Sequence, residues 1–468
     1  MNGTYAASSR AMRAVVLYAS VLFGCALTVG CTQPPNDSEG ESEQTALDPW
    51  AKSYNFGVYG NSIAAGPEGD VVIGGTFDET ADFGGGMLAG DEGRAVFLAH
   101  LDAAGEHLMS GSTGSNDQVK ATAVADSGAF YIAGSYDGAI NFGGGKLTGY
   151  QNGYFAAFDK GGASDFSFAV GTDTQDSIDS VTVTPNGNIV IAGRAGSDAD
   201  FGAGPQDTGT LTKQGVIAAY TRSGEHLWEI RMPYADTVEL KVTSDNVGNV
   251  IVTGGTYSTI QFGNMTVDAG AFVGKISSTG LPLWIVATES PDYYVLPYFR
   301  DVQVAPNGDV LILGYYYYGQ CNMGDIKSPF IDDSQPFVIR LSATGKPVGM
   351  QMFDVPLYGG PPSFALTPDG EMLMAFNAYL SADLGGGLIG TGIDSNVLLA
   401  RFSPEGNHIK SMELKGDRNE TVMDIASDAD GNMLIIGQFD GKVEFSGKKL
   451  DSQYTNATYV GRIDLAPE

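Results

Sequence analysis

Histidine is the first residue to consider for catalysis or metal binding, and this chain contains only four. His107, His226 and His408 stand in the segments GEHL, GEHL and GNHI, at the same place in three copies of a repeating unit described below. Equivalent positions in separate copies lie in different sectors of a ring, so these residues cannot share a metal ion. We expect them to be turn residues at the rim, and we expect His100, on the polar side of a strand, to be solvated.

Two other patterns could suggest ligand chemistry. DADGN at 428–432 resembles the start of a calcium loop, but no glutamate follows at the spacing of an EF-hand, and Asp and Asn before Gly are ordinary turn residues. The glycines of DFGGG are followed by no helix signal and no Lys-Ser/Thr pair, which argues against a phosphate-binding loop. No GxSxG motif is present, although residue order alone does not exclude a Ser-His-Asp triad. We therefore predict no cofactor, no metal site and no catalytic residues.

The elements that carry these residues come from an internal repeat. A turn glycine followed by an apolar run, as in TPNGNIVIAG at 184–193 and APNGDVLILG at 305–314, occurs seven times at intervals of 59 to 62 residues. The seven turn glycines are Gly69, Gly128, Gly187, Gly248, Gly308, Gly370 and Gly431. A second marker of the type DFGGG and a third of the type VIAAYTRSGEHLW follow in phase, and such a period indicates a repeat architecture.

Each copy reads as four short strands joined by turns. In the third copy these are SVTVT at 180, the apolar run after the PNG turn, VIAAYT at 216 and HLWEI at 226. The predicted fold class is all-β, a seven-bladed β-propeller of four-stranded antiparallel blades without helices.

The two ends of the chain predict how the ring closes. The seventh copy ends after its third strand, YVGRIDLAPE, whereas an additional segment, PWAKSYNFG at 49–57, precedes the first copy. Its Trp50 corresponds to Trp228 and Trp284 of the fourth strands HLWEI and PLWIV. We expect this N-terminal strand to complete the last blade, because closure leaves no strand edge unpaired.

Residues 1–30 contain two arginines and the apolar run AVVLYASVLFGCALTVG, which predicts a signal peptide. LTVGC at 27–31 resembles the lipobox of bacterial lipoproteins, although Thr28 stands where leucine is usual, and LFGC ending at Cys25 is a competing match. The resemblance implies that Cys31 is lipidated, with palmitate-type acylation, and anchors the protein to a membrane of the cell envelope. An ordinary secretory signal is the alternative interpretation. Residues 31–48 are predicted to be a disordered polar tether before the propeller at 49–468.

Composition agrees with export and limits the partners. The formal net charge is −30, and removal of residues 1–30 would make it −32, because two arginines and no acid are lost. Such a surface repels nucleic acid. Cys321 is the only cysteine of the propeller, so no disulfide is expected within it. We expect a monomer in the envelope, in the outer membrane of a Gram-negative bacterium.

The units GNIVIAG, DFGGG and VIAAYTRSGEHLW resemble the SBBP-type seven-bladed β-propeller repeats of secreted bacterial surface proteins and lipoproteins. The resemblance covers residues 49–468 and implies an architecture rather than an activity.

One aromatic region interrupts the repeat and is the candidate binding site. It comprises SPDYYVLPYF at 290–299 and YYYYGQCNMGD at 315–325, and the predicted partner-binding residues are Tyr293, Tyr294, Tyr298, Phe299, Tyr316 and Tyr318. Alternate tyrosines packing between blades is the competing interpretation, with Tyr316 and Tyr318 on one side of the strand. We interpret the protein as a non-enzymatic scaffold that binds an envelope protein or glycan.

The alternative is a hydrolase or lyase with a site at the channel mouth, which polar and non-repeating side chains on the inner strands would favour. Five residues before each turn glycine the residues are mostly small: Ala64, Ala123, Thr182, Thr243, Gln303, Ala365 and Ala426. This position favours binding over catalysis.

Overall fold

The structure is a computed structural model. It describes residues 48–466 apart from 55–56, 115–116, 172–175, 205–212, 233–238, 290–296, 391–394, 446 and 453–455, and the side chains of 91–93 and 445. Every regular element in this part of the chain is a β-strand. It accordingly contains no helix that is long and apolar enough to cross a membrane.

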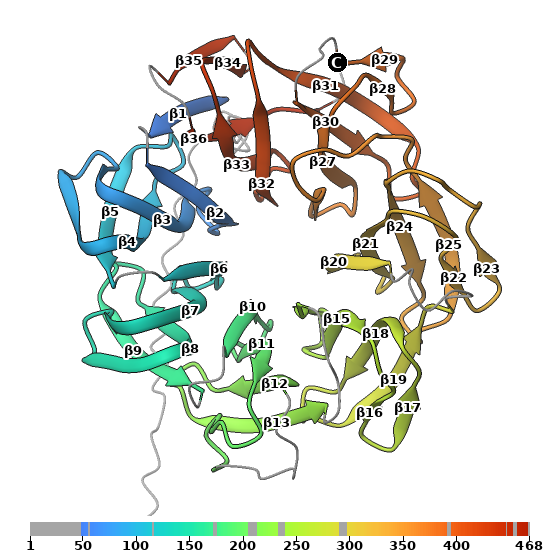
Figure 1. Ribbon diagram of the computed structural model, residues 1–468, viewed down its shortest axis with the longest axis horizontal. Coiled ribbons are helices and arrows are strands. Elements are labelled where there is room, and N and C mark those ends of the chain that lie inside the picture. Colours follow the sequence, from blue (N-terminus) through green and yellow to red (C-terminus); the bar gives the residue numbers. More distant parts are fainter. Residues whose placement is uncertain are drawn as a thin grey trace, which may run out of the picture. The chain divides into compact units, whose positions relative to one another are not determined.

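Seven antiparallel sheets form a ring, which confirms the predicted propeller (Figure 1). The innermost strands are β2 (Val58–Ala65), β6 (Gln118–Val124), β10 (Ser177–Val183), β14 (Lys241–Ser244), β20 (Tyr298–Val304), β26 (Ser363–Leu366) and β32 (Glu420–Ser427). The second strands are β3 (Val71–Asp82), β7 (Phe130–Asn141), β11 (Ile189–Ala195), β15 (Val250–Thr256), β21 (Val310–Tyr316), β27 (Met372–Ala378) and β33 (Met433–Phe439).

The outer half of each blade completes the sheet. The third strands are β4 (Met87–Leu101), β8 (Lys146–Phe158), β12 (Gln214–Tyr220), β18 (Gly270–Ile276), β24 (Gln335–Leu341), β30 (Asn396–Phe402) and β36 (Ala457–Ile463). The fourth strands are β5 (His107–Thr113), β9 (Ser164–Val170), β13 (His226–Met232), β19 (Pro282–Ala287), β25 (Pro347–Met352), β31 (His408–Gly416) and β1 (Trp50–Tyr54).

The connection between second and third strands holds additional short hairpins in blades 4 to 7. They are β16 (Ile260–Phe262) with β17 (Met265–Val267), β22 (Asn322–Met323) with β23 (Ile326–Lys327), β28 (Ala382–Asp383) with β29 (Leu388–Ile389), and β34 (Lys442–Phe445) with β35 (Lys448–Asp451). These connections and the blade-to-blade connections open on one face of the ring, the loop face. The turns that carry the seven glycines open on the other, the turn face.

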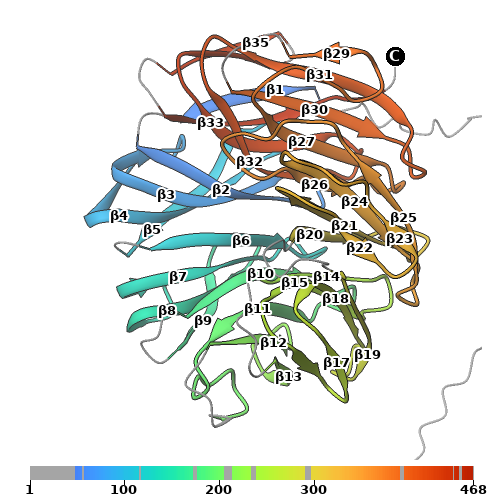
Figure 2. The ribbon, with the colours of Figure 1, turned by 45° about the vertical axis from the view of Figure 1, so that its right-hand side comes forward.

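The core is divided into layers between blades. Each of the seven buried apolar clusters combines side chains of two neighbouring blades, and the cluster of Trp50, Val71 and Leu434 joins blade 7 to blade 1. The apolar runs after the turn glycines are buried on both faces, which is why they do not alternate. Figure 2 shows the blades following one another around the ring.

The predicted closure is confirmed. β1 pairs with β36 from Trp50 opposite Arg462 to Tyr54 opposite Thr458, so the N-terminal strand completes blade 7. The Trp50 indole N–H donates to the carbonyl of Ala103 in blade 1 at 3.1 Å, and the ring covers Gly105, where a Cβ would come within 2.6 Å of it. Trp228 and Trp284 make the same contact to the next blade, with the carbonyls of Ser278 and Ala343.

The expectation that His100 is solvated is wrong. His100 is buried, and its Nε2 lies 2.6 Å from the Asp70 carboxylate beside the first turn glycine. At the same third-strand position, Lys275, Arg340, Arg401 and Arg462 form ion pairs with Asp245, Asp309, Glu371 and Asp428. The cations also reach the next blade, as where Arg462 donates to the carbonyls of Gly69 and Ala103. This position therefore holds neighbouring blades together.

Candidate functional site

The predicted aromatic residues divide into three groups. Tyr293 and Tyr294 lie outside the described residues, as does Cys31. Phe299 and Tyr316 are buried in the core between blades 4 and 5, where the Tyr316 hydroxyl donates to Ser328 Oγ at 3.0 Å. Tyr298 is half-buried and Tyr318 is 51% exposed. Phe299 and Tyr316 thus occupy packing positions, whereas Tyr298 and Tyr318 reach the loop face.

Aromatic side chains do gather on the loop face of blade 5, in a combination that differs from the predicted one. Tyr298 stacks on Tyr315 with ring centroids 5.3 Å apart, and Tyr317 meets Tyr315 edge to face at 5.5 Å. Tyr318 meets Phe330 edge to face at 5.0 Å. We call these five residues the blade-5 aromatic cluster.

The cluster offers a large apolar area to solvent. Tyr317 is 59% exposed and Phe330 is 58% exposed. β21 ends at Tyr316, so Tyr317 and Tyr318 follow the strand and both point outward, which the strict alternation of a continuing strand would not allow. In blade 6, Tyr358 and Tyr379 form a second exposed pair at the same two connections, with centroids 5.3 Å apart.

The innermost strands surround a cavity of about 1260 Å³. Residues from all seven inner strands or the segments just before them line it, among them Ser62, Lys120, Ser180, Lys241, Asp301, Ser363 and Asp424.

A repeated β-bulge explains why polar side chains face this cavity. The pairing of first and second strands shifts at Ile178/Ser180, Phe299/Asp301 and Val422/Asp424, and likewise in blades 1 and 2. A bulge adds an unpaired residue and re-aims the side chains before it. The inserted residues are Asn61, Lys120, Asp179, Arg300 and Met423, and four of these five are polar.

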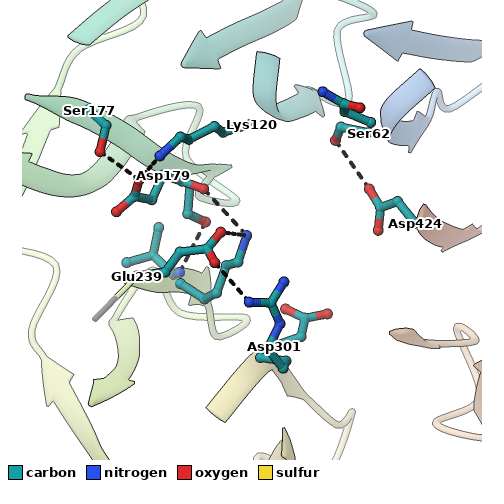
Figure 3. A network of polar contacts seen from close by, with 12 residues as sticks. Ser62, Lys120, Ser177, Asp179, Glu239, Asp301 and Asp424 are labelled. Carbon is teal, nitrogen blue, oxygen red and sulfur yellow. Dashed lines mark hydrogen bonds and ion pairs between the residues drawn. The ribbon is translucent and has the colours of Figure 1, made fainter. Parts of the chain in front are cut away.

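Asp179 is the centre of the first group of ion pairs (Figure 3). Its carboxylate is fully buried, with Lys120 Nζ 2.7 Å from Oδ1 and Arg194 Nε 3.0 Å from Oδ2. The Ser177 hydroxyl donates to Oδ1 at 2.7 Å. A buried carboxylate needs such partners because desolvation penalises its charge, and here the partners come from blades 2 and 3.

Glu239 is the centre of the second group. Lys241 Nζ and Arg300 Nη1 lie 3.0 and 2.9 Å from its two carboxylate oxygens. Burial alone would raise the pKa of Glu239, but these two cations lower it to about 2. Lys241 also donates to the backbone carbonyl of Asp179 at 3.4 Å, which connects the two groups. We call Lys120, Asp179, Arg194, Glu239, Lys241 and Arg300 the channel network.

Two further carboxyl groups face the cavity without a cation in direct contact. Burial raises the pKa of Asp301 to about 7; the charge of Lys241 opposes this rise and that of Asp424 adds to it. Burial also raises the pKa of Asp424, whose Oδ2 accepts from the Ser62 hydroxyl at 3.1 Å and from the Ile63 amide at 3.0 Å. Figure 3 shows Asp301 close to the Glu239 group and Asp424 beside Ser62.

Sequence reasoning missed the channel network because it compared a single position of each inner strand. That position, five residues before the turn glycine, lines the cavity in six of the seven blades, but most of the charged residues lie at other positions. Five residues before the turn glycine the side chains are small, but at eight residues before it the sequence reads Asn61, Lys120, Asp179, Leu240, Arg300, Pro362 and Met423. At seven residues before it, three of the seven are Lys241, Asp301 and Asp424. The sequence therefore contains polar residues that differ from copy to copy, at the positions of the inner strand that form the bulge.

The histidines lie away from this cavity, in third and fourth strands. His107 and His408 each place Nε2 3.0 Å from a serine hydroxyl of the same outer strand, Ser110 and Ser411. Asp428 of the DADGN turn pairs with Arg462 and accepts from the amides of Asp430 and Asn432. Among the described residues, no group of three or more His, Cys, Asp or Glu could hold a metal ion.

No protein-family model and no curated protein match the sequence. Solved structures do match. A protein of unknown function from Dyadobacter fermentans is 12% identical with a TM-score of 0.39, over 88% of this chain and 99% of that one. A protein of unknown function from Bacteroides caccae is 13% identical with a TM-score of 0.29, over 60% and 93%. A mutant puromycin hydrolase is 12% identical with a TM-score of 0.44, over 85% and 53%. At these identities the likeness concerns the fold alone.

Proposed function

We propose that this protein is a non-enzymatic, lipid-anchored propeller of the cell envelope that binds a protein or glycan partner on its loop face. The observation that carries the proposal is the blade-5 aromatic cluster, which exposes Tyr317, Tyr318 and Phe330 on the loop face. Tyrosine buries a large area on binding at little cost in conformational entropy, so exposed tyrosines that support one another are typical of binding sites.

A lipid on Cys31 would hold this face outside the cytoplasm. The lipobox-like LTVGC supports lipid on Cys31, and the polar residues that follow supply a tether between lipid and propeller. The formal net charge of −30 keeps anionic lipid and nucleic acid away from the propeller, so the lipid rather than the protein surface would contact the membrane.

The test is a comparison of two tyrosine variants in binding to an array of envelope glycans and to purified envelope proteins. Tyr317→Ala with Tyr318→Ala should abolish binding while leaving the melting temperature within about a degree of wild type, because both side chains are exposed. Tyr150→Ala in blade 2 removes another tyrosine of similar exposure and is the matched control. Equal binding by the three proteins would contradict the proposal.

A second candidate, an enzyme with its site in the channel, is favoured by Asp301. A carboxyl group with a pKa of about 7 in a cavity is suited to general acid or base catalysis. If the protein is a hydrolase or lyase, it should release soluble fragments from envelope polysaccharide, and Asp301→Asn should stop the release without weakening binding.

A further inference from the structure

We propose that the channel network binds a carboxylate group of an acidic oligosaccharide whose chain leaves the cavity across the blade-5 aromatic cluster. This inference rests on the proposed function, since it names the partner class for the same loop face.

The first support is the local charge. Lys120, Arg194, Lys241 and Arg300 face the cavity and form ion pairs with two carboxylates, Asp179 and Glu239. Four cations beside two paired anions leave a positive excess within the channel network, in a chain that is otherwise strongly acidic. Of the other charged residues that line the cavity, Arg94 pairs with Asp78, and Asp117 adds one negative charge. The raised pKa values of Asp301 and Asp424 reduce the negative charge that these groups add near neutral pH. An anion is therefore attracted to this cavity more than to the rest of the surface.

The second support is that the four cationic side chains keep N–H groups that the ion pairs do not use. The four cationic side chains keep 20 to 30% of their surface exposed, whereas Asp179, which they surround in part, is fully buried. An ammonium group has three N–H donors and a guanidinium five. Among the described residues, Lys120 Nζ contacts only Asp179, and Arg194 uses Nε and Nη2 on the same carboxylate. Their other N–H groups are available to a ligand carboxylate in the cavity.

The third support is the path from the network to the loop face. Arg300 and Tyr298 stand two residues apart on β20, and Tyr298 stacks on Tyr315. Burial and the neighbouring Tyr317 raise the pKa of Tyr315, while the charge of Arg300 opposes this rise. The aromatic surface thus begins beside the cation pair of Glu239 and continues outward to Tyr317.

This combination fits a sugar acid better than an acidic peptide. Amide side chains that both donate and accept line the cavity, among them Asn61, Gln118, Gln303 and Gln438, and they match the hydroxyl groups of a sugar. The faces of sugar rings are apolar and pack on tyrosine rings. A cavity of about 1260 Å³ exceeds the usual size of a site for one small molecule, so it has room for several sugar units.

The experiment is isothermal titration calorimetry of the full-length protein in detergent with three ligands. They are trigalacturonic acid, the neutral trisaccharide maltotriose and a tetraglutamate peptide. The proposal predicts binding of the acidic trisaccharide at least tenfold tighter than that of the other two, because a charge-assisted contact is worth a tenfold factor or more. The affinity should also fall as salt is raised.

Substitutions inside and outside the channel network test whether the ligand binds there. Lys120→Gln should weaken binding of trigalacturonic acid about tenfold or more, whereas Lys160→Gln, which removes an exposed lysine paired with Glu68 outside the channel, should leave it unchanged. Arg300→Gln, in the partly exposed pair with Glu239, is a second channel variant should Lys120→Gln fold poorly. Preference for the peptide, equal affinity for the neutral sugar, or wild-type affinity in both channel variants would overturn the inference. Binding of neutral glycans that is lost in Tyr317→Ala with Tyr318→Ala would then leave the proposed function standing.

Discussion

One buried arginine, Arg462, connects blade 7 to blade 1, and we predict that its loss strongly destabilises the protein. Arg462 is fully buried and pairs with Asp428, which is 1% exposed, with Nε 3.0 Å from Oδ2. Its other nitrogens donate to the carbonyls of Gly69 and Ala103 in blade 1 at 2.8 and 2.9 Å. Arg462→Met keeps most of the side-chain volume and removes all three contacts.

The expected loss in the free energy of unfolding depends on the Asp428 carboxylate, which stays buried without its partner. Removal of one partner of a buried ion pair costs about 3–5 kcal/mol, because the other charge stays buried without compensation. Arg340→Met at the same position of blade 5 is the matched control, since Arg340 and Asp309 each keep 22% of their side-chain surface exposed. Water can solvate the remaining Asp309, so we expect a loss of roughly 1 kcal/mol there.

Urea denaturation followed by circular dichroism measures the difference. With an m-value of about 3 kcal/mol/M or more, the Arg462 variant should unfold at a urea concentration lower by roughly 1 M, and the control by a few tenths. Adding Asp428→Asn to Arg462→Met should recover part of the loss, because the uncompensated charge is removed while an oxygen still accepts from the turn amides. Equal losses in the two arginine variants, or no recovery, would refute this account of the junction.

Three further predictions concern the ends of the chain and the channel. Deletion of β1 should lower the melting temperature far more than deletion of residues 32–47, because it exposes the edge of β36 and removes Trp50 from the core; equal melting temperatures would refute closure. Cys31→Ala should move the protein from the membrane fraction to the soluble fraction in cell fractionation, whereas release by Cys25→Ala would identify the other cysteine as the lipidated one. Asp301→Asn should change the pH dependence of stability. The pKa of about 7 in the folded protein lies above the ordinary aspartate value of 3.8, so the wild type loses stability as the pH rises from about 4 through 7, by a few kcal/mol at most. The variant should lack this loss when urea titrations at pH 5 and pH 8 are compared.

The fold could be predicted from the sequence because each blade repeats the same local signals. Turn glycines such as Gly187 fix where the first two strands meet, and the apolar run after each of them is buried on both faces. Trp50 could be assigned to a fourth strand because Trp228 and Trp284 mark the same position. Periodic signals of this kind are redundant, so one weak copy does not change the interpretation.

The candidate site was harder to predict because it depends on departures from the repeat. The bulge at Ile178/Ser180 and its equivalents changes which residues of the inner strand face the cavity, and a bulge leaves no fixed residue signature. The position with small residues also lines the cavity, but it lies on the far side of the bulge from Lys120, Asp179 and Arg300, so it does not predict their charges. His100 was misplaced for a related reason: its partner Asp70 is distant in sequence and approaches only when the strands pair.

The aromatic residues show the same limit. Alternation along a strand predicts that Tyr316 and Tyr318 share a side, but β21 ends at Tyr316, which is buried, while Tyr317 and Tyr318 are both exposed. Phe330 joins the cluster from a later segment, and no sequence signal connects it with Tyr318.

The most direct test of a binding function on the loop face is photo-crosslinking in living cells. A photoreactive amino acid placed at position 318 on the loop face should give a covalent adduct with the partner, seen as a shifted band of the full-length protein. The same amino acid at position 247, where Val247 is 71% exposed in a turn of the opposite face, should give none. Adducts at 247 and none at 318 would contradict the account.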